Sequence, residues 1–325
     1  MAQTYTVSGR VTDASTGEYV LGANVIDDKS GRGVSTNIYG FFSLTLPEGA
    51  SSLTCTFIGY RQVKKAFKGP DNEEWNVELV PSSVTVDEAT VVGSSGQNTE
   101  STNLGKTDVA IATIQRLPAL MGEVDVLKAI QLLPGIQSAG EGNSGFYVRG
   151  GGPDQNLLLL DNAAIYNASH LFGFFSVFNA DAISSVEVYK GTMPARFGGR
   201  VSSVLDLSLK EGNRKEFKGS GGVGIISSRL TLEGPVKEGV SSFIVSGRRT
   251  YIDVLTKPYV KTTQAAGSGY YFYDLNAKYN HRFSDRDEVF ISGYFGRDVF
   301  SFQSADAGFG AVSYTHLTLP TILLV

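Results

Sequence analysis

Hydrophobic and polar residues alternate in short runs over roughly the first 80 positions of the chain. The runs are separated by Gly, Asp and Pro turn signals, and they read "YTVSGRVTD", "GANVID", "FFSLTLPEG", "SLTCTFIGY" and "EWNVELV". Short alternating runs with such punctuation are typical of antiparallel strands that bury one face. The pattern predicts a small β-sandwich over residues 1–81.

Residues 82–104 are rich in Ser, Thr, Asn and Gly and contain one short apolar core, "ATVV". Such a composition buries too little surface to order itself, so it predicts a flexible linker that carries a short extended segment. A partner protein can capture an extended segment of this kind by adding it to the edge of a sheet.

The pattern changes between residues 105 and 212. Val124, Leu127, Ile130 and Leu133 recur at helical spacing before "PG", which predicts a short amphipathic helix. Four strand candidates surround it, "FYVRG", "NLLLLDN", "SSVEVYKG" and "SSVLDLSLKEG". Together they predict a compact α+β domain.

Long alternating runs fill residues 213–312. In "YYFYDLNAKYNHRFS" one face carries Tyr271, Tyr273, Leu275, Ala277, Tyr279 and Phe283, and the other carries Asp274, Asn276, Lys278, Asn280 and Arg282. An apolar face, a charged face and aromatic ends are typical of strands in outer-membrane barrels. A soluble sandwich also alternates, but its strands usually have about 5 or 6 residues. The pattern therefore favours the first strands of an antiparallel transmembrane barrel.

The final "VSYTHLTLPTILLV" departs from this style, and "SYTHLTLPT" resembles translated sequencing-adapter text. We therefore expect residues 313–325 to be a non-native tail and the barrel to be truncated.

Charge and hydropathy exclude several classes of protein. The net charge is −4, and the lysines and arginines are scattered, which excludes binding to nucleic acid. No run of about 18 apolar residues exists, so no transmembrane helix is predicted. The opening "MAQTYTVSGRV" lacks the regions of a signal peptide, so we expect the export signal to be absent from this chain.

Candidate chemistry is sparse. The single cysteine, Cys55, lies in a strand pattern, and three histidines are too few for a Cys/His metal cluster. "GSGGVG" at 219–224 matches a dinucleotide-binding glycine pattern, but a strand pattern follows it instead of a helix. We expect no metal and no cofactor.

The block from Phe146 to Phe175, "FYVRGGGPDQNLLLLDNAAIYNASHLFGFF", looks like an active site at first sight. However, its glycines precede no Lys-Ser/Thr pair, and proximity of His170 to Ser169 and Asp161 in sequence does not make a catalytic triad. We therefore interpret His170 as a structural hydrogen-bonding residue and predict no catalytic residue.

Two resemblances add to this reading. On "VSGRVTDASTG", "STNIYGFFSLTLPEG" and "FIGY", the N-terminal region resembles the carboxypeptidase-regulatory-like domain, a transthyretin-like sandwich. On "YVRGGG", "LLLLDN", "SVEVYKG" and "PARFGGRVSSVLD", residues 146–212 resemble the plug domain of TonB-dependent outer-membrane receptors. Asn162 departs from the glycine that many members carry after the aspartate. "LEGPVKEGVSSFIVSGRRTYIDVL" likewise resembles a first barrel hairpin of such receptors.

The resemblance implies a mainly β protein with a sandwich, an α+β plug and an incomplete barrel. It also implies a TonB box in "VDEATVVGS", consisting of Val86, Asp87, Glu88, Ala89, Thr90, Val91 and Val92. The implied partners are TonB with ExbB and ExbD in the periplasm, outer-membrane lipid, and a small-molecule or glycan substrate, with a surface lipoprotein as an optional partner.

The resemblance further implies residues that hold the plug in place. Candidate latches between plug and barrel wall are Arg149, Arg196 and Arg200, with Asp161 and Glu187 as internal counter-charges. Candidate plug turns contain Gly150, Gly151, Gly152, Gly191, Gly198 and Gly199.

The implied function is nutrient uptake through the outer membrane, of a siderophore, an oligosaccharide or a similar compound, without enzymatic activity. Two alternatives remain at this point. A surface glycan-binding or adhesin-type β protein would explain the sandwich and the aromatic residues, and a nucleotide-using enzyme would need the glycine runs to bind phosphate.

Overall fold

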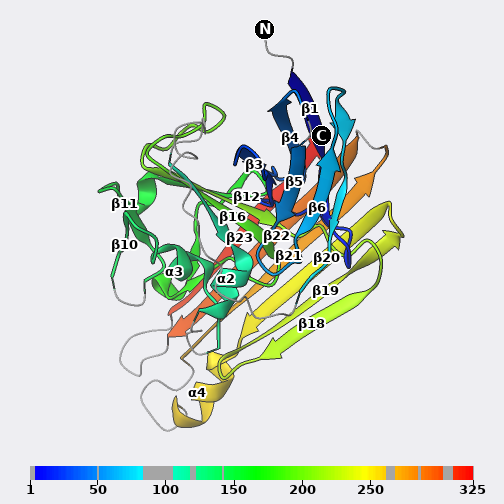
Figure 1. The fold of residues 1–325 in the computed structure, drawn as a ribbon. Helices are drawn as coiled ribbons and strands as arrows, with labels where there is room; N and C mark the ends of the chain where they lie inside the picture. The colour runs from blue at the N-terminus through cyan, green and yellow to red at the C-terminus, as the bar shows by residue number, and fades with distance from the viewer. Residues whose placement is uncertain are drawn as a thin grey trace. The chain divides into compact units, whose positions relative to one another are not determined.

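The computed structural model describes residues 4–49, 51–82, 105–117, 122–140, 143–260, 268–284, 287–302 and 310–324. The chain forms two compact units (Figure 1). One contains residues 1–100 together with Asn213–Glu216, and the other contains residues 101–212 and 217–325.

The first unit is a β-sandwich, as the alternation predicted. Its strands are β1 (Thr4–Asp13), β2 (Asn24–Asp27), β3 (Gly33–Ser35), β4 (Phe41–Pro47), β5 (Ser51–Thr56), β6 (Val63–Phe67), β7 (Glu73–Glu74) and β8 (Val77–Leu79). One sheet has the order β4-β1-β7 with β8 also paired to β1, and the other has the order β3-β2-β5-β6. Trp75 packs edge-on against Phe42 and Phe67 in the core, with ring centroids 6.1 and 5.6 Å away. Cys55 is a buried core residue.

Residues 213–216 pack onto this sandwich. The backbone N–H of Arg214 donates to the carbonyl of Thr16 at 2.8 Å, and the Lys215 ammonium donates to the carbonyl of Ala14 at 2.7 Å. The sequence had placed these residues at the start of the barrel region.

The second unit begins with an α+β domain. Its elements are β9 (Lys106–Ala110), α2 (Ile111–Arg116), α3 (Val126–Ile130), β10 (Ile136–Ser138), β11 (Phe146–Val148), η1 (Pro153–Gln155), β12 (Asn156–Leu160), β13 (Ala163–Ala164), β14 (Ser169–His170), η2 (Leu171–Gly173), β15 (Phe175–Ser176), β16 (Ile183–Lys190) and β17 (Ser203–Leu209). The central sheet has the order β13-β12-β17-β16-β9, so β9 is an edge strand. All four predicted strand candidates form strands.

The predicted helix before Pro134 is shorter than its apolar spacing indicated. Asp125 caps α3 by accepting from the backbone N–H of Lys128 at 3.1 Å, and α3 ends at Ile130. Leu132, beyond its end, is 70% exposed. The apolar periodicity therefore continues past the helix into turns.

The departure at Asn162 has a local explanation. Asp161 and Asn162 form the two-residue turn between β12 and β13, with φ angles of 47° and 66°. Two positive φ values are the geometry of a type I′ hairpin turn, which Asn and Asp tolerate better than other non-glycine residues. The turn is therefore kept without glycine.

The unit continues with a six-stranded antiparallel meander, which we call the outer sheet. Its strands are β18 (Lys218–Val223), β19 (Ser227–Lys237), β20 (Ser241–Thr250), β21 (Gly269–Arg282), β22 (Glu288–Phe302) and β23 (Gly310–Leu324), with α4 (Ile252–Val260) between β20 and β21. "GSGGVG" lies at β18, and most of the expected tail, 313–325, lies in β23. No helix over the described residues has the length and apolar character needed to span a membrane.

The outer sheet has the reverse polarity of a soluble sheet. On β21 the polar residues Asp274, Asn276, Lys278 and Asn280 are buried. Apolar residues on the other face, such as Leu275 and Ile291, are 46% and 43% exposed. The two faces predicted from sequence are confirmed, and the polar face is the one that the protein covers. This reversal is typical of membrane-barrel strands, whose apolar side meets lipid.

Candidate functional site

The covered face of the outer sheet carries charged side chains that the α+β domain buries. Arg248 on β20 and Lys278 on β21 are 4% and 7% exposed, and Asp274 on β21 is 3% exposed. A buried charge is costly unless it is paired and hydrogen-bonded. The partners of these three residues therefore define the contact between the sheet and the domain.

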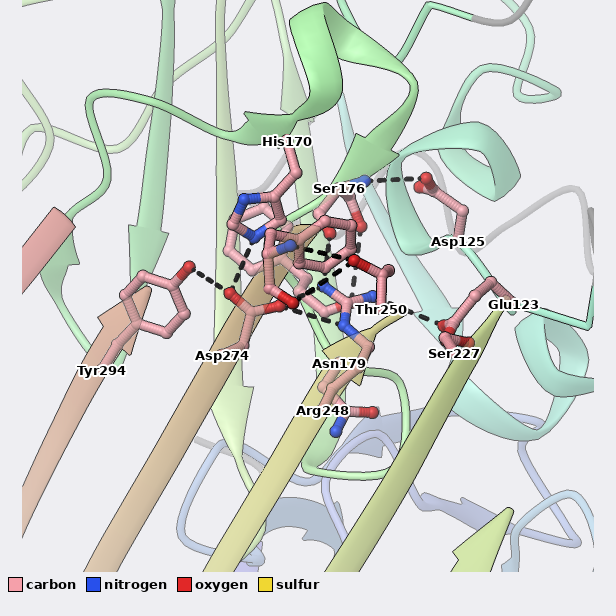
Figure 2. A network of polar contacts seen from close by, with 12 residues as sticks. Glu123, Asp125, His170, Ser176, Asn179, Ser227, Arg248, Thr250, Asp274 and Tyr294 are labelled. Atoms are coloured by element: carbon pink, nitrogen blue, oxygen red, sulfur yellow. Dashed lines mark hydrogen bonds and ion pairs between the residues drawn. The ribbon is translucent and has the colours of Figure 1, made fainter. Parts of the chain in front are cut away.

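Arg248 joins the two parts directly (Figure 2). Its guanidinium donates to Asp274 Oδ2 through Nε at 3.0 Å and through Nη2 at 2.5 Å. The same Nη2 donates to the Ser176 carbonyl of the α+β domain at 2.7 Å, and Nη1 lies 3.5 Å from Glu123 Oε2. Glu123 also accepts a hydrogen bond from the Ser227 hydroxyl of β19. One guanidinium thus links the sheet to two segments of the domain.

His170 makes the second link. Its Nε2 lies 2.7 Å from Asp274 Oδ1, and its Nδ1 lies 2.7 Å from Asp298 Oδ2 on β22. The ring stacks on Phe272 with centroids 4.0 Å apart and planes 8° apart. Because a carboxylate oxygen only accepts hydrogen bonds, both ring nitrogens must donate, so the geometry requires an imidazolium. Burial is the largest single effect and opposes that charge, but the Asp274 carboxylate and the hydrogen bond to Asp298 together outweigh it and raise the pKa of His170 above its ordinary value.

Tyrosine hydroxyls complete the hydrogen bonding of the two aspartates. Tyr294 donates to Asp274 Oδ1 at 2.7 Å, and Tyr270 donates to Asp298. The Tyr270 hydroxyl also accepts from the backbone N–H of Leu171 at 2.7 Å, next to His170. The residue interpreted from sequence as a structural hydrogen bonder is therefore the centre of a buried ionic network. We call Glu123, His170, Arg248, Asp274 and Asp298 the central network.

A second contact lies at Asp161, one of the predicted charged residues. The Lys278 ammonium donates to Asp161 Oδ1 at 3.1 Å and to the Leu209 carbonyl at 3.2 Å. Asp161 also accepts from the backbone N–H of Leu209 at 3.0 Å. The aspartate of the β12–β13 turn thus pairs with a lysine of the outer sheet.

Two further polar contacts lie on β19 and β20. Arg229 Nε is 2.6 Å from Asp181 Oδ2, and the Asn179 amide donates to the Ser246 hydroxyl at 2.8 Å. The contact between the domain and the sheet is therefore polar along four neighbouring strands, β19 to β22.

Glu187 and Arg196 lie elsewhere, within the α+β domain. Glu187 Oε1 is 3.0 Å from Lys106 Nζ at the start of β9, and Glu187 Oε2 accepts from the Tyr189 hydroxyl at 2.7 Å. Arg196 donates to that hydroxyl at 3.1 Å. Burial, followed by the nearby Glu187 charge, raises the pKa of Asp206 to about 7.

The other predicted latch arginines are exposed. A Cβ added to Gly191 would lie 2.2 Å from Arg149 Nη1, so the Arg149 guanidinium packs over that glycine. Arg200 donates to the Gly199 carbonyl at 2.9 Å.

The glycines of the predicted plug turns differ in conformation. Gly150, Gly191 and Gly199 have positive φ angles. Gly151 approaches the Ser202 side chain closely, and Gly152 and Gly198 have ordinary φ angles. The TonB-box-like residues 86–92 lie outside the described residues.

Sequence reasoning missed most of the central network. Asp274 and Lys278 were assigned to a polar face without partners, and Glu123, Arg248 and Asp298 were not singled out. The available signal was the presence of charges on the polar face of an alternating run. Among the residues that the structure describes, no group of His, Cys, Asp and Glu has an arrangement that could hold a metal ion.

Comparison with known proteins assigns two domains. Residues 7–92 match the family model of the CarboxypepD_reg-like domain, and residues 106–203 match that of the TonB-dependent Receptor Plug Domain. No curated protein matches the chain. The second match assigns the α+β domain of this chain to the plug domain of TonB-dependent receptors.

Structural comparison finds similarity to several solved structures, all with TM-scores below 0.5. The siderophore receptor PirA from Acinetobacter baumannii is 21% identical, with 62% of this chain and 32% of that chain covered and a TM-score of 0.45. The outer membrane transporter YddB from Escherichia coli is 15% identical, with 65% and 35% covered and a TM-score of 0.46. The copper transporter OprC is 11% identical, with 66% and 33% covered and a TM-score of 0.43. The chain spans about a third of the length of these proteins.

Removing the Arg248 charge should weaken the contact strongly. Arg248→Gln leaves Glu123 buried without its cation and Asp274 with His170 as its one remaining cationic partner among the described residues, and breaking a buried ion pair in this way costs about 3–5 kcal/mol. We expect the free energy of unfolding of the full-length receptor, measured by chemical denaturation, to fall by that amount. Arg248→Lys should lose less, and Lys237→Gln, which removes an exposed charge from β19, should have little effect. Equal stability of Arg248→Gln and Lys237→Gln would contradict the assignment.

The imidazolium of His170 should make stability depend on pH. Because its folded pKa is raised above the ordinary value of about 6.5, its contribution is complete below about pH 6.5 and is lost as pH rises through the folded pKa. We expect His170→Gln to lower the Tm of the full-length receptor in acid, and the difference from wild type to shrink as pH rises. A difference that stays constant from about pH 5 to about pH 9 would show that His170 does not carry the charge.

Proposed function

We propose that this chain, as part of a TonB-dependent receptor, imports a scarce nutrient through the outer membrane, with the plug as gate and TonB as the source of energy. The nutrient class is a siderophore, an oligosaccharide or a similar compound. The observation that carries the proposal is the buried polar contact between the plug and the covered face of the outer sheet. A gate needs a closed state that is specific and can be reversed without covalent chemistry, and ion pairs provide both.

The closed gate depends on a few plug segments. Glu123, Asp161, His170 and Asp181 each contact a charged residue on a strand of the outer sheet. These contacts hold the part of the plug that contains β12 to β15 and the start of β16. Substrate binding on the extracellular side would act on this plug, and release toward the periplasm requires part of it to move.

Force would enter the plug at β9. The TonB-box-like segment, Val86–Val92, precedes β9 in the chain, and TonB would capture it by strand addition. In the part of the chain that the structure describes, β9 is an edge strand paired with β16 alone, over five registered residue pairs from Lys106↔Tyr189 to Ala110↔Ser185. Its first residue, Lys106, is held by the largely buried Glu187 at 3.0 Å. A pull on the linker would first break the hydrogen bond that the Lys190 N–H donates to the Gly105 carbonyl at 3.0 Å, then this ion pair, and would then release β9 one residue pair at a time.

We further propose that the sandwich lies in the periplasm and that TonB acts with ExbB and ExbD. This orientation puts the linker of residues 82–104 on the side from which the pulling force comes. A surface lipoprotein that delivers substrate would act on the opposite side.

Deletion of Val86–Gly93 from the full-length receptor tests the energy coupling. We expect substrate binding to cells to be unchanged and uptake to be lost, because the plug remains folded but is no longer pulled. A deletion of equal length at 95–102, within the same linker, is the control and should leave uptake intact. Uptake at the wild-type rate without Val86–Gly93 would contradict the proposal.

A further inference from the structure

The exposed face of the outer sheet carries a row of polar side chains that the gating function does not use. Ser228, Arg249, Tyr273 and Arg297 lie directly opposite one another on four consecutive strands, β19 to β22. Neighbouring strands are about 4.8 Å apart, so the two arginines stand about 10 Å apart on either side of Tyr273. Arg249 and Arg297 are both exposed, and the Arg249 guanidinium lies 5.3 Å from the centre of the Tyr271 ring.

An apolar row adjoins the polar row. This row consists of Leu230, Gly247, Leu275 and Phe295, which lie opposite one another. Each is two residues from the polar row, on the side toward the connections 238–240 and 283–287. Because Gly247 has no side chain, the sheet is hollowed there into a groove of about 580 Å³. Leu230, Leu275 and Phe295 line it, and it reaches Arg249 and Tyr273 at the polar row. The groove thus has an apolar floor and a cationic end.

The ends of the strands indicate which leaflet this row faces. β19–β20 and β21–β22 are joined by short connections, 238–240 and 283–287, at the end of the strands far from the polar row. The polar row lies near the other end, where the three residues 224–226 join β18 to β19 and the longer connection 251–268, which contains α4, joins β20 to β21. Barrels of the outer membrane have short turns on the periplasmic side and longer loops outside. The polar row therefore lies at the level of the outer leaflet.

The exposed face of β19 to β22 carries basic residues but, within the described range, no acidic ones. The acidic residues of β19 to β22 within the described range are Glu233, Asp274, Glu288 and Asp298. By the alternation of the strands, all four lie on the face opposite to the exposed one. Arginine pairs with phosphate through two parallel hydrogen bonds, and it is stable at an aromatic surface. Two arginines beside a tyrosine, at the boundary of an apolar band, match a phosphate that is attached to a hydrocarbon chain.

We propose that this groove binds a phosphorylated lipid of the outer leaflet. Arg249 and Arg297 hold the headgroup phosphate with the Tyr273 hydroxyl, and one acyl chain lies over Gly247 between Leu230, Leu275 and Phe295. The site would fix the depth of the first strands in the membrane and is separate from the path gated by the plug.

Native mass spectrometry of the full-length receptor, delipidated and then incubated with lipid A or with a neutral diacyl galactolipid, tests this site. We expect lipid A, which carries phosphate, to be retained and the galactolipid to be lost. Arg249→Gln combined with Arg297→Gln should lower retention of lipid A about tenfold, because charge-assisted hydrogen bonds are removed. Lys237→Gln, at the far end of β19, should retain it as wild type does.

Gly247→Leu tests the groove with both arginines present. A Cβ at this position would meet only the Asp274 carbonyl oxygen at 3.8 Å and Leu275 Cδ1 at 4.0 Å, both ordinary contacts, so the first atom of a side chain fits without disturbing the strand. It should fill the groove and also lower retention of lipid A. Retention at the wild-type level in both variants, or equal retention of the two lipids by wild type, would overturn the proposal.

Discussion

The structure of the second unit depends on the pairing of the Arg248 guanidinium. The outer sheet places polar and charged residues on the face that the protein covers and apolar residues on the face that is exposed. This arrangement is stable only if each buried charge finds a partner, since an unpaired ion in a low-dielectric interior costs several kcal/mol. Arg248 meets Asp274 on its own sheet and Ser176 and Glu123 on the plug. The sheet therefore needs the plug to pair its buried charges, and the same contacts hold the plug in place.

The contacts also divide the plug mechanically. Segments around Glu123, Asp161, His170 and Asp181 are fixed to the outer sheet by ion pairs or hydrogen bonds to ionised groups. β9 lies at the other edge of the plug sheet, and the ion pairs of its Lys106, to Asp108 and Glu187, stay within the plug. An edge strand held on one side is the element that a pull from the linker reaches first. Such a division allows a stable closed state and a weak starting point for opening within one domain.

The architecture could be predicted from the sequence because the alternation of hydrophobic and polar residues shows directly which face of a strand is buried. The sandwich, the four plug strands and the two faces of β21 were all predicted from it. The length of α3 was not, because the apolar spacing at Leu133 continues beyond the residue where the helix ends. Asp161 was identified as a charge of the plug, but its partner, Lys278, lies 117 positions away.

The central network was missed for the same physical reason. Hydropathy patterns show that Asp274 lies on a polar face, but they do not show which residue neutralises it. His170, Arg248 and Asp274 come together only through the packing of β14 against β20 and β21. Pairing between distant segments is information that a single sequence, read by periodicity, does not contain.

A reversible cross-link between β9 and β16 tests most directly whether the plug opens by release of its edge strand. Thr107 and Val188 are opposite one another in register, and cross-strand pairs are close enough for a disulfide. The account predicts that Thr107→Cys combined with Val188→Cys binds substrate in both redox states but imports it only when reduced, whereas Thr107→Cys alone imports in both. Uptake at the same rate by the oxidised double variant would show that β9 stays paired during transport and would contradict the account.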